Sequence, residues 1–185
     1  MTWINTWSGK TIDYINLRTD QIDIIDIATA LSRECRFAGH CRHFYSVAQH
    51  SVLVSRLVPP DLALEGLLHD ATESYLKDLP SPLKALLPDY SEVEGRFETA
   101  IRKRFGLPVI PSPAIKAADL VLLATERRDI FPDDLVDWPI VAGIEPMPRQ
   151  IWPLAPEMAK EQFLDRYRSL TGEALDHKRR LERVR

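Results

Sequence analysis

The chain has 185 residues, of which 45% are hydrophobic and 28% are charged. That composition excludes wholesale disorder, and the length suits one compact domain. The net charge of −3 removes the main electrostatic reason to expect a nucleic acid or an anionic membrane as partner. We find neither a long apolar run nor a secretion signal, so we expect a protein that is not inserted in a membrane. Its two cysteines are too few for a disulfide scaffold, and the cytoplasm is the simplest location.

The chain starts with a short segment of β-forming and turn residues and continues with helical patterns. Residues 3–14 are typical of a hairpin or an irregular arm. Apolar residues then recur at helical spacing in five further stretches, at 22–31, 47–54, 60–76, 90–105 and 114–128, and a last helix is expected at 156–170. The proline-rich stretch 131–156 predicts a long ordered loop packed by Trp138 and Trp152. The fold class is therefore mostly α.

The C-terminal end differs in charge from the rest of the chain. Residues 171–185 hold five basic and three acidic groups, so residues 1–170 are more acidic than the chain as a whole. We expect residues 1–170 to form the domain and residues 171–185 to form a basic helix extension or tail. A solvated helix end is the simpler interpretation of this tail, and contact with nucleic acid is the alternative.

The segment Leu67-Leu68-His69-Asp70-Ala71-Thr72-Glu73 carries the first candidate site. On one helix, Asp70 and Glu73 share a face, and His69 lies beside the apolar run. Two carboxylates and an imidazole on the inner side of a helix bundle are costly unless a cation compensates them. The pattern therefore indicates a metal ion.

Two further polar residues stand in apolar surroundings and are candidate ligands from neighbouring helices. His50 lies in an otherwise apolar helical stretch, and Asp119 lies among alanines and leucines. Taken singly, such a histidine is usually a hydrogen-bonded core residue and such an aspartate is often a helix cap. Together with His69 and Asp70 they favour a metal site.

The order His50, His69-Asp70, Asp119 resembles the signature of the HD-domain metal-dependent phosphohydrolases. The segments Asp78-Leu79-Pro80-Ser81-Pro82-Leu83-Lys84 and Lys116-Ala117-Ala118-Asp119 are similar to those of the bacterial 5'-deoxynucleotidase branch and its phage relatives, which include deoxynucleoside triphosphate hydrolases. The resemblance covers about residues 1–170. It implies an HD-domain helical bundle with one divalent transition metal ion, Co, Mn, Fe or Zn, held by His50, His69, Asp70 and Asp119.

The resemblance also implies roles for residues around the metal. The acid matching Glu73 positions or activates the attacking water, and the acid matching Asp78 assists nearby. Arg36 and Phe37 match an Arg-aromatic pair in which the arginine contacts phosphate and the aromatic ring borders the nucleoside. Phenylalanine stands here where this branch has tryptophan, which leaves the base contact open.

The expected substrate is a deoxynucleotide, and Lys84 and Lys116 are secondary candidates for its phosphate. Both fit equally well as solvated lysines. A 5'-nucleotidase that releases phosphate from deoxynucleoside monophosphates is the first hypothesis, and a triphosphohydrolase is the alternative. A nucleotide-binding regulatory module with little turnover is the alternative of another class, and a nucleic-acid phosphodiesterase is disfavoured by the acidic balance. We also expect a homo-oligomer.

Two other clusters have competing interpretations. Cys35, His40, Cys41 and His43 lie within nine residues and resemble a zinc knuckle, but their spacing fits no standard finger. A loop that covers the site is the preferred interpretation. The charged residues 126–129 end a predicted helix, and we expect them to form a salt-bridged or oligomer surface.

Overall fold

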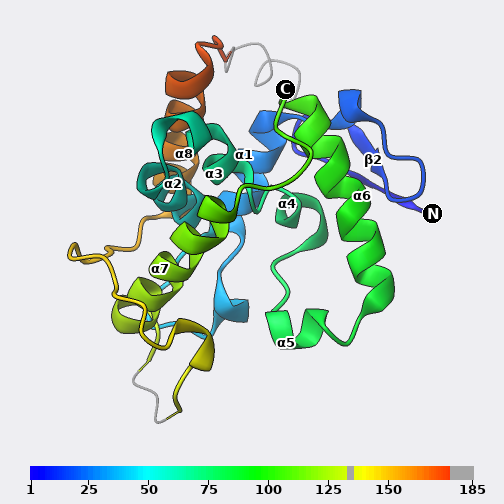
Figure 1. Cartoon of the computed structure of the whole chain (residues 1–185). Helices are drawn as coiled ribbons and strands as arrows, with labels where there is room; N and C mark the ends of the chain where they lie inside the picture. The colour runs from blue at the N-terminus through cyan, green and yellow to red at the C-terminus, as the bar shows by residue number, and fades with distance from the viewer. Residues whose placement is uncertain (133–135, 176–185) are drawn as a thin grey trace.

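The computed structural model describes residues 1–132 and 136–175, beginning with an antiparallel hairpin (Figure 1). Strands β1 (Trp3–Asn5) and β2 (Thr11–Asp13) pair with Ile4 opposite Ile12. The connecting turn contains Gly9 at φ +77°, a conformation that favours glycine. Ser8 in the same turn donates from its backbone N–H and its hydroxyl to the buried Asp26 carboxylate, at 2.6 and 2.7 Å. The hairpin that the sequence predicted is therefore present, and Ser8 attaches it to the helical body.

Helices make up the rest of the regular structure, so the prediction of a mostly α domain is confirmed. Short 3₁₀ segments occur at 19–21, 37–39, 60–62 and 139–141. The α-helices in chain order are α1 (Ile24–Arg33), α2 (Val47–Leu57), α3 (Ala63–Leu68), α4 (Glu73–Leu76), α5 (Ser81–Lys84), α6 (Pro88–Arg104), α7 (Pro113–Asp129) and α8 (Pro156–Thr171).

Local signals in the sequence set several helix ends. Asp23 caps α1 by accepting from the N–H of Ile25, and Ser46 caps α2 by accepting from the N–H of Gln49. Ser112 does the same for α7, with a proline at the first helical position. Helix α8 ends at Thr171 and is capped by Gly172, whose φ of +71° is left-handed.

Helix α2 lies at the centre of the bundle, against α3, α7 and α8 (Figure 1). Helix α1 packs on α2, α4 and α8, and the side chains of Ile27, Leu31 and Phe163 between these elements are fully buried. Burial of such side chains is the main stabilising contribution to a fold of this kind. Because α2 is central, polar side chains on it are forced to find partners inside the protein.

The structure corrects two details of the expected elements. Residues 60–76 are not one helix, because a turn at 69–72 separates α3 from α4. The backbone N–H groups of Ala71, Glu73, Ser74 and Tyr75 bond to carbonyls three residues earlier, a tighter winding than that of an α-helix. Trp152, expected to pack the proline-rich loop, is 71% exposed, whereas Trp138 does pack, on Phe131.

The predicted C-terminal extension falls largely outside the described residues, which end at 175. Among the helices that the structure describes, none is both long and apolar enough to cross a membrane.

Candidate metal centre

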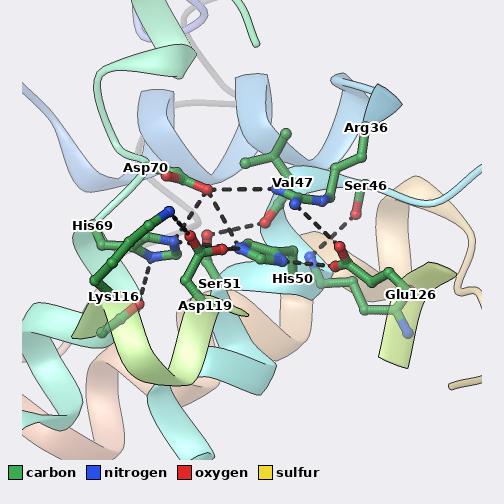
Figure 2. Close-up of polar contacts among 12 residues, drawn as sticks. Arg36, Ser46, Val47, His50, Ser51, His69, Asp70, Lys116, Asp119 and Glu126 are labelled. Carbon is green, nitrogen blue, oxygen red and sulfur yellow. Dashed lines mark hydrogen bonds and ion pairs between the residues drawn. The ribbon is translucent and has the colours of Figure 1, made fainter. Parts of the chain in front are cut away.

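Side chains from three segments of the chain converge beside α2. His50 lies on α2, His69 and Asp70 lie in the turn after α3, and Asp119 lies on α7. His50 Nε2 is 3.3 Å from His69 Nε2 and 3.4 Å from Asp119 Oδ1. Asp70 Oδ2 is 3.5 Å from His50 Nε2 and 3.2 Å from His69 Nε2 (Figure 2). The structure thus brings His50, His69 and Asp119 into one group, and Asp70, the fourth residue that the resemblance implied, contacts both histidines.

Hydrogen bonds on the far side of each imidazole ring orient the two histidines. His50 Nδ1 lies 2.7 Å from Glu126 Oε1, and His69 Nδ1 lies 2.9 Å from the carbonyl oxygen of Gly66. A carbonyl oxygen and an ionised carboxylate only accept, so each Nδ1 donates. In neutral rings, both Nε2 atoms therefore direct a lone pair into the cluster, as metal-ligating histidines do.

Two imidazole nitrogens with nearby carboxylates form a donor set that could hold a metal ion. Without a cation these acceptors attract protons instead. Burial and the Arg36 charge lower the pKa of His50, but Glu126 and Asp119 outweigh them and raise it to about 9. Burial opposes the charge of Asp119 as well, yet its hydrogen bond with His50 holds its pKa below the usual value.

A buried acid, Glu73, begins helix α4 one turn beyond Asp70. Its side chain is nearly inaccessible, with the residue 8% exposed, and its Oε2 atom is buried without a hydrogen-bond partner. Burial raises its pKa well above the usual value, and the charges of Asp70 and Asp78 raise it further. Asp78 is half-buried after α4, and burial raises its pKa too. Both predicted catalytic acids therefore lie within electrostatic range of Asp70.

Three cationic side chains surround the acidic cluster. Lys116 is 66% exposed and pairs with Asp119 at 2.8 Å, on the solvent side of the cluster. Lys84 is half-buried and pairs with Glu94 at 2.7 Å. Arg36 is buried, with Nη2 3.0 Å from Glu126 Oε2 and Nη1 3.6 Å from Asp70 Oδ2. The sequence anticipated these cations, and their contact with phosphate stays a prediction.

Phe37, the predicted neighbour of the nucleoside, lies in an aromatic group next to Arg36. Its ring centroid is 5.5 Å from that of Phe131 and 6.1 Å from that of Trp138. The backbone at Phe37 and Ala38 is left-handed, with φ of +57° and +51°. Such conformations are costly for residues other than glycine and cluster at functional sites. The arrangement places an apolar wall beside the buried guanidinium.

Glu126 is the site residue that sequence reasoning missed. It was expected on a charged surface with residues 127–129, but it is fully buried between His50 and Arg36. The available signal was its position seven residues after Asp119, which places both acids on one face of a helix. Burial opposes its charge, and Arg36 and His50 hold its pKa below the usual value.

The alternative zinc knuckle is not assembled. Cys35 and Cys41 are free cysteines with their sulfur atoms 3.6 Å apart. Among the residues that the structure describes, the group of three or more converging metal ligands is His50, His69 and Asp119, and neither His40 nor His43 joins the two cysteines.

Two curated proteins are similar to the chain over most of its length. No family model matches it. An Escherichia coli K-12 protein named uncharacterized protein YfdR is 50% identical over 172 residues, which is 92% of this chain and 97% of the relative. An uncharacterized protein of Rhodobacter capsulatus is 39% identical over 142 residues, 69% of this chain and 72% of the relative. The chain therefore belongs to the same protein family as YfdR.

Proposed function

We propose that the protein is a metal-dependent phosphohydrolase that acts on deoxynucleotides. The observation that carries the proposal is the convergence of His50 Nε2, His69 Nε2, Asp70 Oδ2 and Asp119 Oδ1, with the buried acid Glu73 one turn away. A divalent ion bound there supplies Lewis acidity to a phosphoryl oxygen and lowers the pKa of a bound water. The order of these residues in the chain also resembles the HD-domain phosphohydrolases.

Glu73 has the properties of a proton acceptor in such a reaction. A general base works best when its pKa lies near the working pH, and burial raises the pKa of Glu73 toward that range. The unpartnered Oε2 atom is free to accept a hydrogen bond from water. Asp78 adds a second acid nearby and helps to keep the pKa of Glu73 raised. A protein that only binds nucleotides would have no need for this buried acid.

Three cationic side chains, Arg36, Lys84 and Lys116, can offset the negative charge of a phosphate substrate. Arg36 lies beside Asp70 and Lys116 beside Asp119. Burial opposes the charge of Lys84, but Glu94 raises its pKa, and the nearby charges of Glu73 and Asp70 raise it further. A phosphate that approaches the proposed metal ion would thus meet positive charge on more than one side. Deoxynucleoside monophosphates are the first proposed substrates, and the deoxyribose preference rests on the resemblance.

A substrate panel tests the proposal directly. The purified protein is incubated with Mn²⁺ or Co²⁺ and with deoxynucleoside monophosphates, deoxynucleoside triphosphates or ribonucleoside monophosphates, and the products are separated by chromatography. Orthophosphate from monophosphates supports the nucleotidase, and tripolyphosphate from triphosphates supports the alternative triphosphohydrolase. Glu73→Gln, purified in parallel, controls for contaminating phosphatases. Binding without turnover on any substrate would refute the enzyme and favour a regulatory module.

A further inference from the structure

Glu126 connects the proposed metal centre to the buried cation behind it. It lies on α7, two turns after Asp119, and none of its surface is exposed. One carboxylate oxygen, Oε1, is 2.7 Å from His50 Nδ1, and the other, Oε2, accepts from Arg36 Nη2 at 3.0 Å (Figure 2). One oxygen thus contacts a proposed metal ligand, and the other contacts a guanidinium.

The contacts of Glu126 and Arg36 form a closed ring with two of the proposed ligands. Arg36 Nη1 lies 3.6 Å from Asp70 Oδ2, and that oxygen lies 3.5 Å from His50 Nε2. The ring thus runs from Glu126 to Arg36, to Asp70, to His50 and back to Glu126. A displacement of Glu126 would change the positions of His50 and Asp70 together, although Glu126 contributes no atom to the cluster itself.

A buried ion pair away from the proposed metal centre provides a comparison for Glu126. Glu65 on α3 is also buried and pairs with Arg102, at 2.6 Å. Its Oε1 atom also accepts from the backbone N–H of Ser112, a contact that joins α3 to the start of α7. Glu126 instead uses its second oxygen on an imidazole whose other nitrogen faces the donor cluster.

We infer that Glu126 is a positioning residue for the metal centre, which fixes His50 with its proton on Nδ1 and holds Arg36 against Asp70. The inference rests on the metal site of the proposed function and is independent of the substrate and of turnover. Partners of this kind behind a ligating histidine typically change metal affinity by 10- to 100-fold, about the range expected here.

The substitution Glu126→Gln tests the inference through metal affinity. The amide has nearly the same volume, but it presents one acceptor and one donor where the carboxylate presents two acceptors. Either His50 Nδ1 or the Arg36 guanidinium then faces an N–H group. We expect the dissociation constant for Co²⁺, measured by titration and competition with a chelator, to rise about 10- to 100-fold. The matched control is Asp26→Asn, which alters a buried carboxylate bound by Ser8 and should leave the affinity within about threefold of wild type.

The outcomes separate this inference from the proposed function. If Glu126→Gln folds and binds Co²⁺ as tightly as wild type, Glu126 is a structural residue and the inference is wrong, while the metal site stands. If the wild-type protein binds neither Co²⁺, Mn²⁺ nor Zn²⁺, the metal site fails and the inference fails with it. Metal binding without turnover would refute the proposed function alone.

A measurement on the wild-type protein keeps the inference testable if the variant does not fold. The chain has five histidines, so a nitrogen-15 spectrum of the Zn²⁺-loaded protein is simple to assign. We expect the His50 ring to bind Zn²⁺ through Nε2 and to keep a slowly exchanging proton on Nδ1. The resonance of that proton should be strongly shifted and coupled to the Nδ1 nitrogen. A His50 ring that binds through Nδ1, or that carries no protected proton there, would overturn the inference.

Discussion

Replacing Glu73 by glutamine should abolish turnover and at the same time stabilise the fold. The carboxyl group is buried, one of its oxygens has no partner, and the neighbouring charges of Asp70 and Asp78 repel its ionised form. Because its pKa is raised in the folded protein, ionisation of Glu73 at neutral pH opposes folding. The neutral amide removes that cost. A gain of about 1 kcal/mol would raise the melting temperature by about 2–4 °C in a domain of this size.

Turnover should fall by about 10²- to 10⁴-fold in the same variant, since the attacking water loses its proton acceptor. Metal content and substrate affinity should stay near wild type, because Glu73 is not one of the four proposed ligands. Steady-state kinetics, elemental analysis and thermal unfolding measure the three quantities. The opposite signs of the effects on activity and stability are the signature of a buried acid kept for function.

Glu65→Gln is the matched comparison, because Glu65 is also a buried acid with one unpartnered oxygen, Oε2, but its other oxygen has strong partners. It bonds to Arg102 at 2.6 Å and to the N–H of Ser112 at 3.0 Å. Weakening a buried pair of this kind leaves Arg102 without its counter-charge and costs up to about 3–5 kcal/mol. We expect lower stability with retained activity of the folded fraction. If Glu73→Gln keeps more than about a tenth of the wild-type kcat, or melts below wild type, the assignment of Glu73 as the base is refuted.

Three further results follow from the site. One divalent ion should bind per chain and be lost in Asp70→Ala, whereas elemental analysis showing two ions, one of them lost on substitution of Cys41, would support the zinc knuckle. In the metal-free protein the pKa of His50 is raised from 6.5 to about 9, so its contribution to stability is complete below pH 6.5 and disappears as the pH rises to about 9. This contribution is at most about 3 kcal/mol and is measured as the change in unfolding free energy between these pH values with chelator present. Saturating metal should remove this pH dependence. Arg36→Lys should lower kcat/KM about 10- to 100-fold at saturating metal, because lysine keeps the charge but lacks the planar guanidinium that can hold two phosphate oxygens. If kcat/KM of both Arg36→Lys and Arg36→Ala stays within about threefold of wild type, Arg36 does not contact phosphate.

Most of the fold follows from local features of the sequence. Apolar periodicity locates the helices, and residues such as Ser46 and Ser112 locate their starts, because capping depends on atoms only two or three residues away. The break at residues 69–72 does not follow from such features. No proline or glycine lies within it, and its backbone bonds to carbonyls three residues back while the apolar pattern continues. Such a change of winding depends on tertiary contacts, which periodicity does not record.

The four proposed ligands were predicted as a set from the order of residues that resembles the HD-domain phosphohydrolases, and His50 and Asp119 also stand out as polar residues in apolar stretches. The contacts that connect these ligands to Arg36 and Glu126 were harder to predict. Arg36 and Glu126 are 90 residues apart in the chain, and their side chains lie 3.0 Å apart only in the folded protein, where α7 packs on α2 and the backbone N–H of Arg36 bonds to the carbonyl of Tyr45 just before α2. Residues 126–129 form one charged run in the sequence, yet the side chain of Glu126 is buried and that of Arg128 is exposed. Arg128 bonds to Asp129 and to the carbonyl oxygen of Met147. A helix turns by about 100° per residue, so one charged run spans opposite environments.

Gly66 lies in the tight contact between α3 and α2 and also contacts a residue of the proposed metal centre. A Cβ atom on Gly66 would lie 3.2 Å from Ser55 Cα and 3.1 Å from a methyl carbon of Val58. The absence of a side chain therefore allows α3 to lie against α2 closely enough for His69 and His50 to meet at 3.3 Å. The carbonyl of Gly66 then accepts from His69 Nδ1 at 2.9 Å and sets the orientation of that ring. The same glycine thus links the packing of α3 on α2 to the orientation of the His69 ring.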